Sequence, residues 1–430
     1  MPLGFSADAQ RVLAAGSAVA RSRVRIQFHG RANDQDGDPV PVWDHYFYPN
    51  DDIVAANPVR RSAPSEFGGA LESDIWNVTV RGILPDANPS SPLYDQNARG
   101  SYGGFIGTSP VTVQFGVRTS HNPAPDGSWE WVDAWSGYVD DVLWPEDGTM
   151  AITCADKTKT IRRTELGDAV SLAGTALDFT SETNAIAMAE ALLTNTTYGV
   201  GLAAADLDAP AWTAAKATMS LHAWNLKGGG AAWDGTNALS VLADIGRHSF
   251  SYFYPNGSGA ITVRTLLPRF LDRPRMLRDS DSLSHVTHER RGTRVRTRVV
   301  VTGTNVTTTT ATSTWNARPD LRADDPVTAN LLTNDTDASK YALWRLARQE
   351  EPRLESPASL GPADVDVDIF DTVRIASRTL GTATVDEIVF EREWDIFNLS
   401  GAIRPVEDAW AQSQWFIVGV DTTRGQQRIF

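Results

Sequence analysis

The spacing of apolar positions changes along the chain and divides it into β-rich and helical segments. Between Val24 and Phe28, apolar residues alternate with arginine and glutamine, which is typical of a strand with one face toward water. A short helix, capped by Ser6 and stopped by Gly16, is expected before it within residues 1–20. Further strands are expected at 46–48, 75–80, 111–118 and 129–144. Many short strands joined by loops rich in Gly, Pro, Asn and Asp predict an antiparallel barrel or sandwich.

A β-hairpin ends this first segment and links it to a helical one. Its first half is rich in Trp, Tyr and Val, and Pro-Glu-Asp-Gly at 145–148 is a turn signature. In its second half, Ile152 and Cys154 share one face of the expected strand, whereas Thr153 and Ala155 share the other.

Helical periodicity begins near residue 164. Two apolar stripes with i, i+3, i+4, i+7 spacing predict helices: Ala185, Met188, Ala189 and Leu192, then Ala238, Val241, Leu242 and Ile245. We expect Asp234 or Thr236 to cap the second helix and Gly246 to end it. Strands at 250–254 and 261–266 then form a hairpin, so this segment predicts a small α+β domain.

Beyond residue 283, side chains again alternate in character with a period of two, which is typical of strands. A helix is expected near 338–348, and strands are expected at 365–375 and 384–397. The chain is therefore predicted to be mainly β with an α+β part. The expected domains are 1–165 (N-terminal helix and first β domain), 166–282 (α+β domain), 283–405 (second β domain) and 406–430 (C-terminal extension).

Composition narrows the classes of function. With 430 residues, the chain is long enough for two to four domains. A net charge of −14 disfavours a protein whose main surface grips nucleic acid. The single cysteine, Cys154, excludes an intrachain disulfide framework. Because no signal-peptide pattern and no run of about 18 apolar residues occurs, we expect a soluble protein made in a cytoplasm. The 14 tryptophans indicate aromatic cores or protein interfaces.

No segment carries the pattern of a catalytic or metal centre. His285 and His288 lie at an expected strand entry without a third ligand nearby. Residues 34–38 resemble half of a calcium loop but lack its bidentate acid, so a surface turn is the better interpretation. Adjacent acids at 140–141 and 386–387 point to opposite faces of a strand and cannot form two facing carboxylates. Neither a Gly-x-Ser-x-Gly motif nor a P-loop is present, so we expect no enzyme activity, no cofactor and no metal.

Two charged stripes are the candidate interface residues. They are Arg294, Arg296 and Arg298 on one expected strand, and Asp364, Asp366 and Asp368 on another, with Val365, Val367 and Ile369 pointing inward. The hypothesis is that the stripes meet, within one barrel or across a subunit boundary, because opposite charges across strands fix register and partner choice. Two separate solvated faces would explain the stripes as well. Contact of the arginines with DNA is a third interpretation, which the overall acidity disfavours.

The succession of segments resembles the hub proteins of phage tails, in particular minor tail proteins of long non-contractile tails. The stretches that carry the resemblance are Trp135-Ser-Gly-Tyr-Val-Asp-Asp-Val142 with Thr153-Cys-Ala-Asp156, Ala191 to Leu202, Ala238 to Ile245, the strand ending Val-Val-Val-Thr-Gly303, and Ile369-Phe-Asp-Thr-Val373. They cover most of residues 20–400 in order.

This resemblance implies two tube-like antiparallel β-barrel domains bridged by the α+β domain. Three chains would then place six similar barrels around one axis and continue a sixfold tube. It also implies a homotrimeric structural hub that closes the distal end of the tail tube, contacts the distal tail ring protein, the tape measure protein and tip or receptor-binding proteins, and lets genomic DNA pass. Such a protein is assembled in the host cytoplasm and resides at the virion tail tip.

Two alternatives stay open. One is a carbohydrate-binding or cell-wall-degrading tail protein, in which Trp129 and Trp131 on one strand face would stack on sugars. The other is the distal tail ring protein itself, which would carry one N-terminal barrel and an appended domain. The β-rich segment beyond residue 283 disfavours that second alternative.

Overall fold

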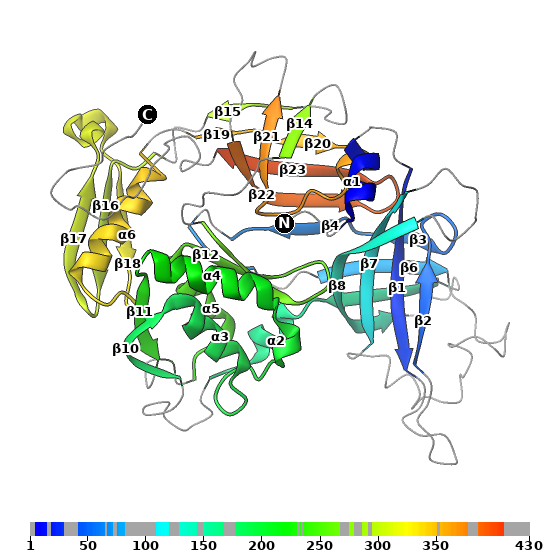
Figure 1. Cartoon of the computed structure of the whole chain (residues 1–430), viewed down its shortest axis with the longest axis horizontal. Helices are drawn as coiled ribbons and strands as arrows, with labels where there is room; N and C mark the ends of the chain where they lie inside the picture. Colours follow the sequence, from blue (N-terminus) through cyan, green and yellow to red (C-terminus); the bar gives the residue numbers. More distant parts are fainter. Residues whose placement is uncertain are drawn as a thin grey trace.

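A computed structural model describes residues 5–14, 19–29, 42–64, 67–71, 75–81, 109–119, 129–143, 149–166, 177–229, 233, 235–266, 275–278, 286–290, 295–350, 353–376 and 386–407. The protein is mainly β, as predicted, and its strands form several separate sheets (Figure 1). No helix in these ranges is long and apolar enough to cross a membrane.

The first sheet has seven antiparallel strands in the order β2-β1-β7-β8-β9-β6-β3. Its strands are β1 (Ala20–His29), β2 (Val42–Phe47), β3 (Ile53–Ala56), β6 (Ile75–Arg81), β7 (Pro110–Arg118), β8 (Trp129–Leu143) and β9 (Thr149–Ala155). The pairing of β8 with β9 confirms the predicted hairpin. Only residues 48–52 connect β2 with β3, although these strands lie at opposite edges, so the sheet must curve strongly.

Helix α1 (Ala7–Ala14) precedes this sheet, as predicted. The Ser6 hydroxyl accepts a hydrogen bond from the backbone N–H of Ala9 at 3.3 Å, which confirms the expected cap. Phe5, Ala9 and Leu13 are buried, so one face of the helix covers the hydrophobic side of the sheet.

The α+β part contains both predicted helices. Its elements are α2 (Thr158–Arg163), β10 (Asp178–Asn184), α3 (Ala185–Thr194), the 3-10 helix Ala204–Asp206, α4 (Ala209–Leu221), β11 (Asn225–Gly229), α5 (Ala238–Ser249), β12 (Ser251–Pro255) and β13 (Ile261–Thr265). Both apolar stripes are buried, and β12 and β13 form the expected hairpin.

Two details of α5 differ from the prediction. The cap is Asn237, whose side chain accepts from the N–H groups of Leu239 and Ser240. The helix also continues through Gly246 and ends at Phe250, which has a left-handed backbone with φ of 49°. A glycine fits at position 246 inside the helix because a β-carbon there would lie 2.8 Å from the Gly69 α-carbon.

A second sheet of eight strands follows the path β14-β21-β22-β23-β19-β15, with β20 beside β23 and β4 beside β22. Its strands are β4 (Val59–Ser62), β14 (Arg275–Arg278), β15 (Glu289–Arg290), β19 (Leu354–Glu355), β20 (Ala358–Leu360), β21 (Thr372–Ala376), β22 (Asp386–Asp395) and β23 (Ser400–Glu407). Residues 408–430, which hold most of the predicted C-terminal extension, lie outside the described residues.

The strand predicted at 365–375 is wrong over its first half. A 3-10 helix, η7 (Pro362–Asp364), and a turn occupy this segment before β21 begins at Thr372. The Asp368 carboxylate accepts from the N–H of Ile369, and the Asp371 carboxylate accepts from the N–H of Asp368. These local side-chain bonds compete with strand pairing, which is why alternating Asp and Val residues do not form a strand here.

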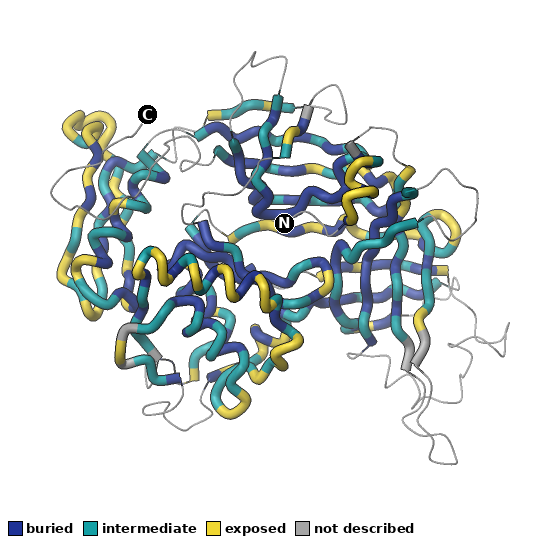
Figure 2. The backbone as a smooth tube through the Cα atoms, viewed as in Figure 1, coloured by how far each residue is buried: buried dark blue, intermediate teal, exposed yellow. Residues whose placement is uncertain are grey.

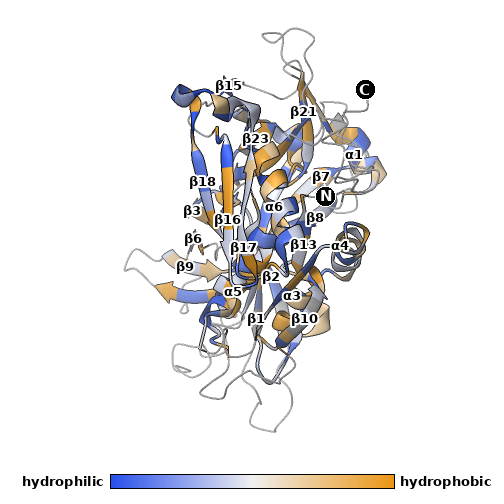
Figure 3. Ribbon diagram, turned by 90° about the vertical axis from the view of Figure 1, so that its left-hand side faces the viewer, coloured by the Kyte–Doolittle hydropathy of each residue, from blue (hydrophilic) through white to orange (hydrophobic). Residues whose placement is uncertain are grey.

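An insert (residues 295–350) interrupts the second sheet between β15 and β19. It contains β16 (Arg298–Gly303), β17 (Val306–Thr312), β18 (Asp324–Thr328), α6 (Asp335–Ala347) and the 3-10 helices Thr314–Ala317 and Pro319–Leu321. Helix α6 confirms the helix expected near 338–348. The central strand β16 is hydrophobic beside a hydrophilic β18 (Figure 3).

The first 70 residues of the sequence supply strands to three different sheets. Strand β4 pairs with β22 in the second sheet, and β5 (Gly69–Ala70) pairs in parallel with β12 in the α+β part. Parts of the chain that are far apart in sequence are therefore joined by short strands, of which β5 is buried and β4 alternates between buried and exposed residues (Figure 2).

Candidate functional site

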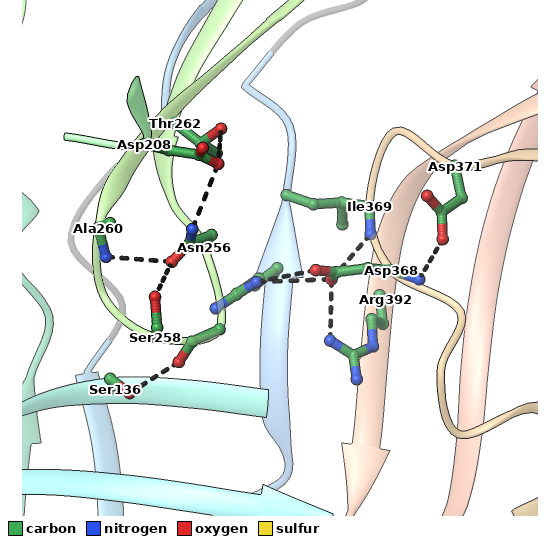
Figure 4. A network of polar contacts seen from close by, with 12 residues as sticks. Ser136, Asp208, Asn256, Ser258, Ala260, Thr262, Asp368, Ile369, Asp371 and Arg392 are labelled. Atoms are coloured by element: carbon green, nitrogen blue, oxygen red, sulfur yellow. Dashed lines mark hydrogen bonds and ion pairs between the residues drawn. The ribbon is translucent and has the colours of Figure 1, made fainter. Parts of the chain in front are cut away.

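Asp368 is the centre of a buried charge cluster that joins distant parts of the chain. Its carboxylate lies 3.2 Å from Arg61 Nη1 on β4 and 2.8 Å from Arg392 Nη1 on β22 (Figure 4). The exposed fractions of these side chains are 9% for Asp368, 4% for Arg61 and 1% for Arg392. One carboxylate thus holds two arginines from strands that are more than 300 residues apart in sequence.

The turn that carries Asp368 is fixed by the main chain on both sides. The N–H of Phe370 donates to the Val389 carbonyl at 2.7 Å, and the Val389 N–H donates to the Asp371 carbonyl at 3.0 Å. Phe370 has a left-handed φ of 62°, and its ring stacks on Tyr252 with centroids 4.3 Å apart. The turn therefore bridges the second sheet and the α+β part.

The electrostatics of the cluster favour an ionised Asp368. Burial opposes its ionisation, but Arg392 and Arg61 outweigh burial and hold the pKa of Asp368 below its usual value. Burial raises the pKa of the neighbouring Asp371. The arrangement pairs buried charges within one chain, which is the requirement for keeping such groups away from water.

The other predicted aspartates are also buried and also paired with an arginine outside the predicted stripe. Arg275 on β14 contacts Asp364 Oδ1 at 2.8 Å and forms an ion pair with Asp366. The expectation that these acids alternate along a strand is wrong, because η7 and the following turn carry them.

The arginine stripe is only partly a strand. Arg298 opens β16 and pairs with Asp324 on the adjacent β18, with Nε 2.8 Å from Oδ1. Arg296 precedes the strand, and its backbone N–H donates to the Gln349 carbonyl. Arg294 lies outside the described residues. The partners seen for Arg298 and for the three aspartates come from outside the other stripe, and the role of both stripes at an interface stays a prediction.

Sequence inspection missed the arginines that complete this cluster: Arg61, Arg275 and Arg392. Only Arg392 carries a signal, because it shares a strand face with Phe390 and Trp394, and a charge between two buried aromatics requires a partner.

Other candidates from the sequence have structural roles. Cys154 is fully buried, as expected, and burial raises the pKa of its thiol. His288 Nδ1 lies 2.9 Å from Ser356 Oγ, while His285 and the segment 34–38 lie outside the described residues. Over the described ranges, no group of three or more His, Cys, Asp or Glu side chains is arranged to hold a metal ion.

The adjacent acids also separate as predicted from strand geometry. Asp140 pairs with Lys159, whereas Asp141 accepts from the backbone N–H of Val142. Asp386 pairs with Arg374, whereas Glu387 is buried and accepts from the Ser356 hydroxyl at 2.7 Å. Neither pair forms two facing carboxylates.

A second polar cluster links the α+β part to the first sheet. The turn between β12 and β13 accepts a hydrogen bond at the Gly257 carbonyl from Ser136 Oγ on β8, at 2.7 Å (Figure 4). Asp208 steadies this turn by accepting from Thr262 Oγ1 at 2.9 Å and from Asn256 Nδ2 at 3.4 Å.

Comparison with known proteins gives similarity in fold only. No protein-family model matches the sequence, and no curated protein matches it. Among solved structures, a tail protein from Neisseria meningitidis aligns with a TM-score of 0.50 and 9% identity, covering 90% of this chain and 97% of that one. The 43 kDa tail protein of prophage MuSo2 from Shewanella oneidensis aligns at 0.48 with 11% identity, over 90% and 98% of the two chains. A prophage tail protein from Listeria monocytogenes aligns at 0.46 with 10% identity, over 89% and 94%.

The alignment with the Neisseria protein spans nearly the whole of both chains. The similarity therefore extends over both large sheets and the α+β part, and is not limited to one sheet. The predicted resemblance to phage tail proteins is confirmed at the level of the fold, and this chain has the fold of a tail protein.

Proposed function

We propose that this protein is a structural component of a phage tail, and more specifically the hub at the distal end of the tail tube. The observation that carries the proposal is the full-length similarity in fold to a tail protein, at a TM-score of 0.50. The two buried clusters support a structural role, because Asp368 and Arg275 each pair with oppositely charged side chains of the same chain.

The finer architecture belongs to the same proposal. The strongly curved seven-stranded sheet is the candidate first barrel, and the eight-stranded sheet is the candidate second barrel. The α+β part bridges them, with boundaries near residues 165, 282 and 405. Three copies would then place six barrel-like units around one axis and extend a sixfold ring.

In this position the protein would contact the distal tail ring protein on one side and tip or receptor-binding proteins on the other. The tape measure protein and, during infection, genomic DNA would pass through the ring. A net charge of −14 supports passage because a negative surface repels phosphate and does not retain DNA.

The mass of the purified assembly tests this proposal. Light scattering should give three times the chain mass of 46.8 kDa, and gold-labelled antibody should mark the tail tip of intact virions in electron micrographs. A monomer or hexamer in solution would contradict the trimer, and label along the tube or on the head would contradict the tail-tip location.

A further inference from the structure

The outer face of the first sheet carries a set of stacked arginine and aromatic side chains. We define this arginine–aromatic face by Arg21, Arg23, Tyr46, Trp129 and Trp131, which come from β1, β2 and β8. Arg21 is exposed, and the other four side chains are half-buried. The hydrophobic side of the same strands, including Val24 and Phe47, is buried, so this face is the outward one.

The side chains of this face are stacked on one another. The Arg23 guanidinium carbon lies 3.9 Å from the ring centroid of Trp131 and 4.1 Å from that of Tyr46. Arg21 lies 5.2 Å from the ring centroid of Trp129, and the two tryptophan rings stack at 5.7 Å.

The strand register creates this stack. Across β1, β7 and β8, Arg21, Gly116 and Trp131 lie opposite one another. A β-carbon on Gly116 would lie 2.7 Å from the Trp131 ring, so the glycine allows that ring to lie on the β7 backbone. Beside it, Arg23 Nε donates to Gln114 Oε1 at 2.7 Å, which fixes the guanidinium.

Such a face has the properties of a binding hot spot. Trp, Tyr and Arg are the residues that dominate the energy of protein interfaces. Because cation–π contacts and a hydrogen bond already hold these side chains, little conformational freedom remains to be lost on binding. Sugar stacking fits less well, since an arginine already lies against a face of each tryptophan ring.

Charge indicates which partner fits. The chain has 53 acidic and 39 basic residues, so the residues outside this face carry the whole acidic excess. Copies of the chain should therefore attract one another when this face meets a different, acidic face of the next copy. A contact between unlike faces is also the type that closes a ring of three.

We propose that the arginine–aromatic face is the surface by which one copy of this chain docks onto the acidic surface of a second copy. This inference rests on the proposed trimer and assigns the residues that form it. The face contributes its tryptophan rings as anchors and its arginines as the charges that choose the partner and its orientation.

The test compares the mass of the wild-type chain with that of Arg21→Glu and of Arg21→Glu combined with Trp129→Ala. Arg318→Glu is the matched control, since Arg318 is a 60% exposed arginine in the insert, paired only locally with Asp320. Circular dichroism and the melting temperature of each variant establish that the fold is kept.

We expect the wild type and Arg318→Glu to be trimers. The single variant should raise the dissociation constant of the trimer at least ~10-fold, and the double variant should run as a monomer. Raising sodium chloride to about 0.5 M should weaken assembly of the wild type, because charge attraction across the contact is screened.

Three results would overturn the inference. If the folded double variant assembles like the wild type, the trimer does not use this face as its contact surface. A wild-type monomer rejects both the trimer and this surface. Loss of duplex DNA binding by variants that still form trimers would assign the face to nucleic acid.

Discussion

Asp368 shows at the scale of one residue how a buried charge can hold a fold together. Its carboxylate accepts hydrogen bonds from Arg61 and Arg392, whose side chains are only 4% and 1% exposed. If this acceptor were lost, water could not replace it, because both guanidinium groups are buried. Removing one partner of a buried ion pair is costly because the remaining charge stays in a nonpolar environment.

Asp368→Asn should therefore lower the free energy of unfolding by about 3 to 5 kcal/mol, measured by urea denaturation at pH 7. Because the pKa of Asp368 is lowered, its contribution is present above the usual carboxyl pKa and is lost as the pH falls through the lowered value. Asp320→Asn, in a 62% exposed ion pair, is the control and should change stability by less than about 0.5 kcal/mol. Equal effects of the two variants would contradict this role.

Glu387 is a buried acid that has no cationic partner among the residues that the structure describes. Burial raises its pKa to about 8; the hydrogen bond from Ser356 opposes that shift, and the charge of Glu407 adds to it. The folded chain therefore holds a proton that the unfolded chain releases above its ordinary pKa of 4.5. Through this group, stability is greatest below pH 4.5 and falls as the pH rises toward 8.

Glu387→Gln should remove this dependence and keep the hydrogen bond from Ser356. The variant should match the wild type near pH 4.5 and exceed it by roughly 4 kcal/mol near pH 8, in parallel urea titrations. Glu393→Gln on the same strand is the matched control for replacing a carboxyl group of β22 by an amide. A constant difference for Glu387→Gln would show that this carboxyl is ionised in the folded state.

At the scale of an element, α5 and β5 are in contact through glycines. A β-carbon on Gly246 would lie 2.7 Å from the Ser251 carbonyl oxygen and 2.8 Å from the Gly69 α-carbon. Both neighbours are main-chain atoms, so neither can rotate away. The short strand from the N-terminal third of the sequence thus reaches the α+β part only because the helix lacks a side chain there.

Gly246→Ala should destabilise the protein by about 1 to 3 kcal/mol and lower its melting temperature. The sign is diagnostic, since alanine in place of glycine inside an exposed helix stabilises by about 1 kcal/mol. Ser240→Ala on the exposed face of the same helix provides the control and should be neutral or slightly stabilising. A raised melting temperature for Gly246→Ala would show that the helix can move away from β5.

At the scale of the whole molecule, the hydrophobic contacts do not follow the order of the sequence. One core contains residues of both large sheets, with Phe115 and Trp394 in edge contact at 6.0 Å. The other joins the α+β part to the insert, where Trp224 and Trp344 stack at 4.7 Å. No large unit can unfold without exposing the apolar surface of another.

The chain should therefore unfold in one transition despite its length. Tryptophan fluorescence and far-UV circular dichroism should give the same urea midpoint, and Trp344→Ala should lower both midpoints together. Leu343→Ala, at a side chain that is 47% exposed, serves as the control and should change them little. A plateau between two separate transitions would show that the cores are independent.

The spacing of apolar residues along the chain was sufficient to predict many of the helices and strands. The strand at Val24, the β8–β9 hairpin, the two apolar helix stripes and α6 all follow from the spacing of apolar residues, because each element must bury its own face. The same rule failed at 365–371, where aspartate side chains bond the nearby main chain and produce a turn.

The sequence by itself determined that the protein is mainly β with an α+β part and that its adjacent acids do not face each other, since these properties depend on neighbours along the chain. Only the tertiary structure decided that β4 joins β22, that Asp368 meets Arg61 and Arg392, and that Trp129 and Trp131 stack beneath arginines. These contacts join positions tens to hundreds of residues apart, and periodicity carries no record of which distant strand lies beside another.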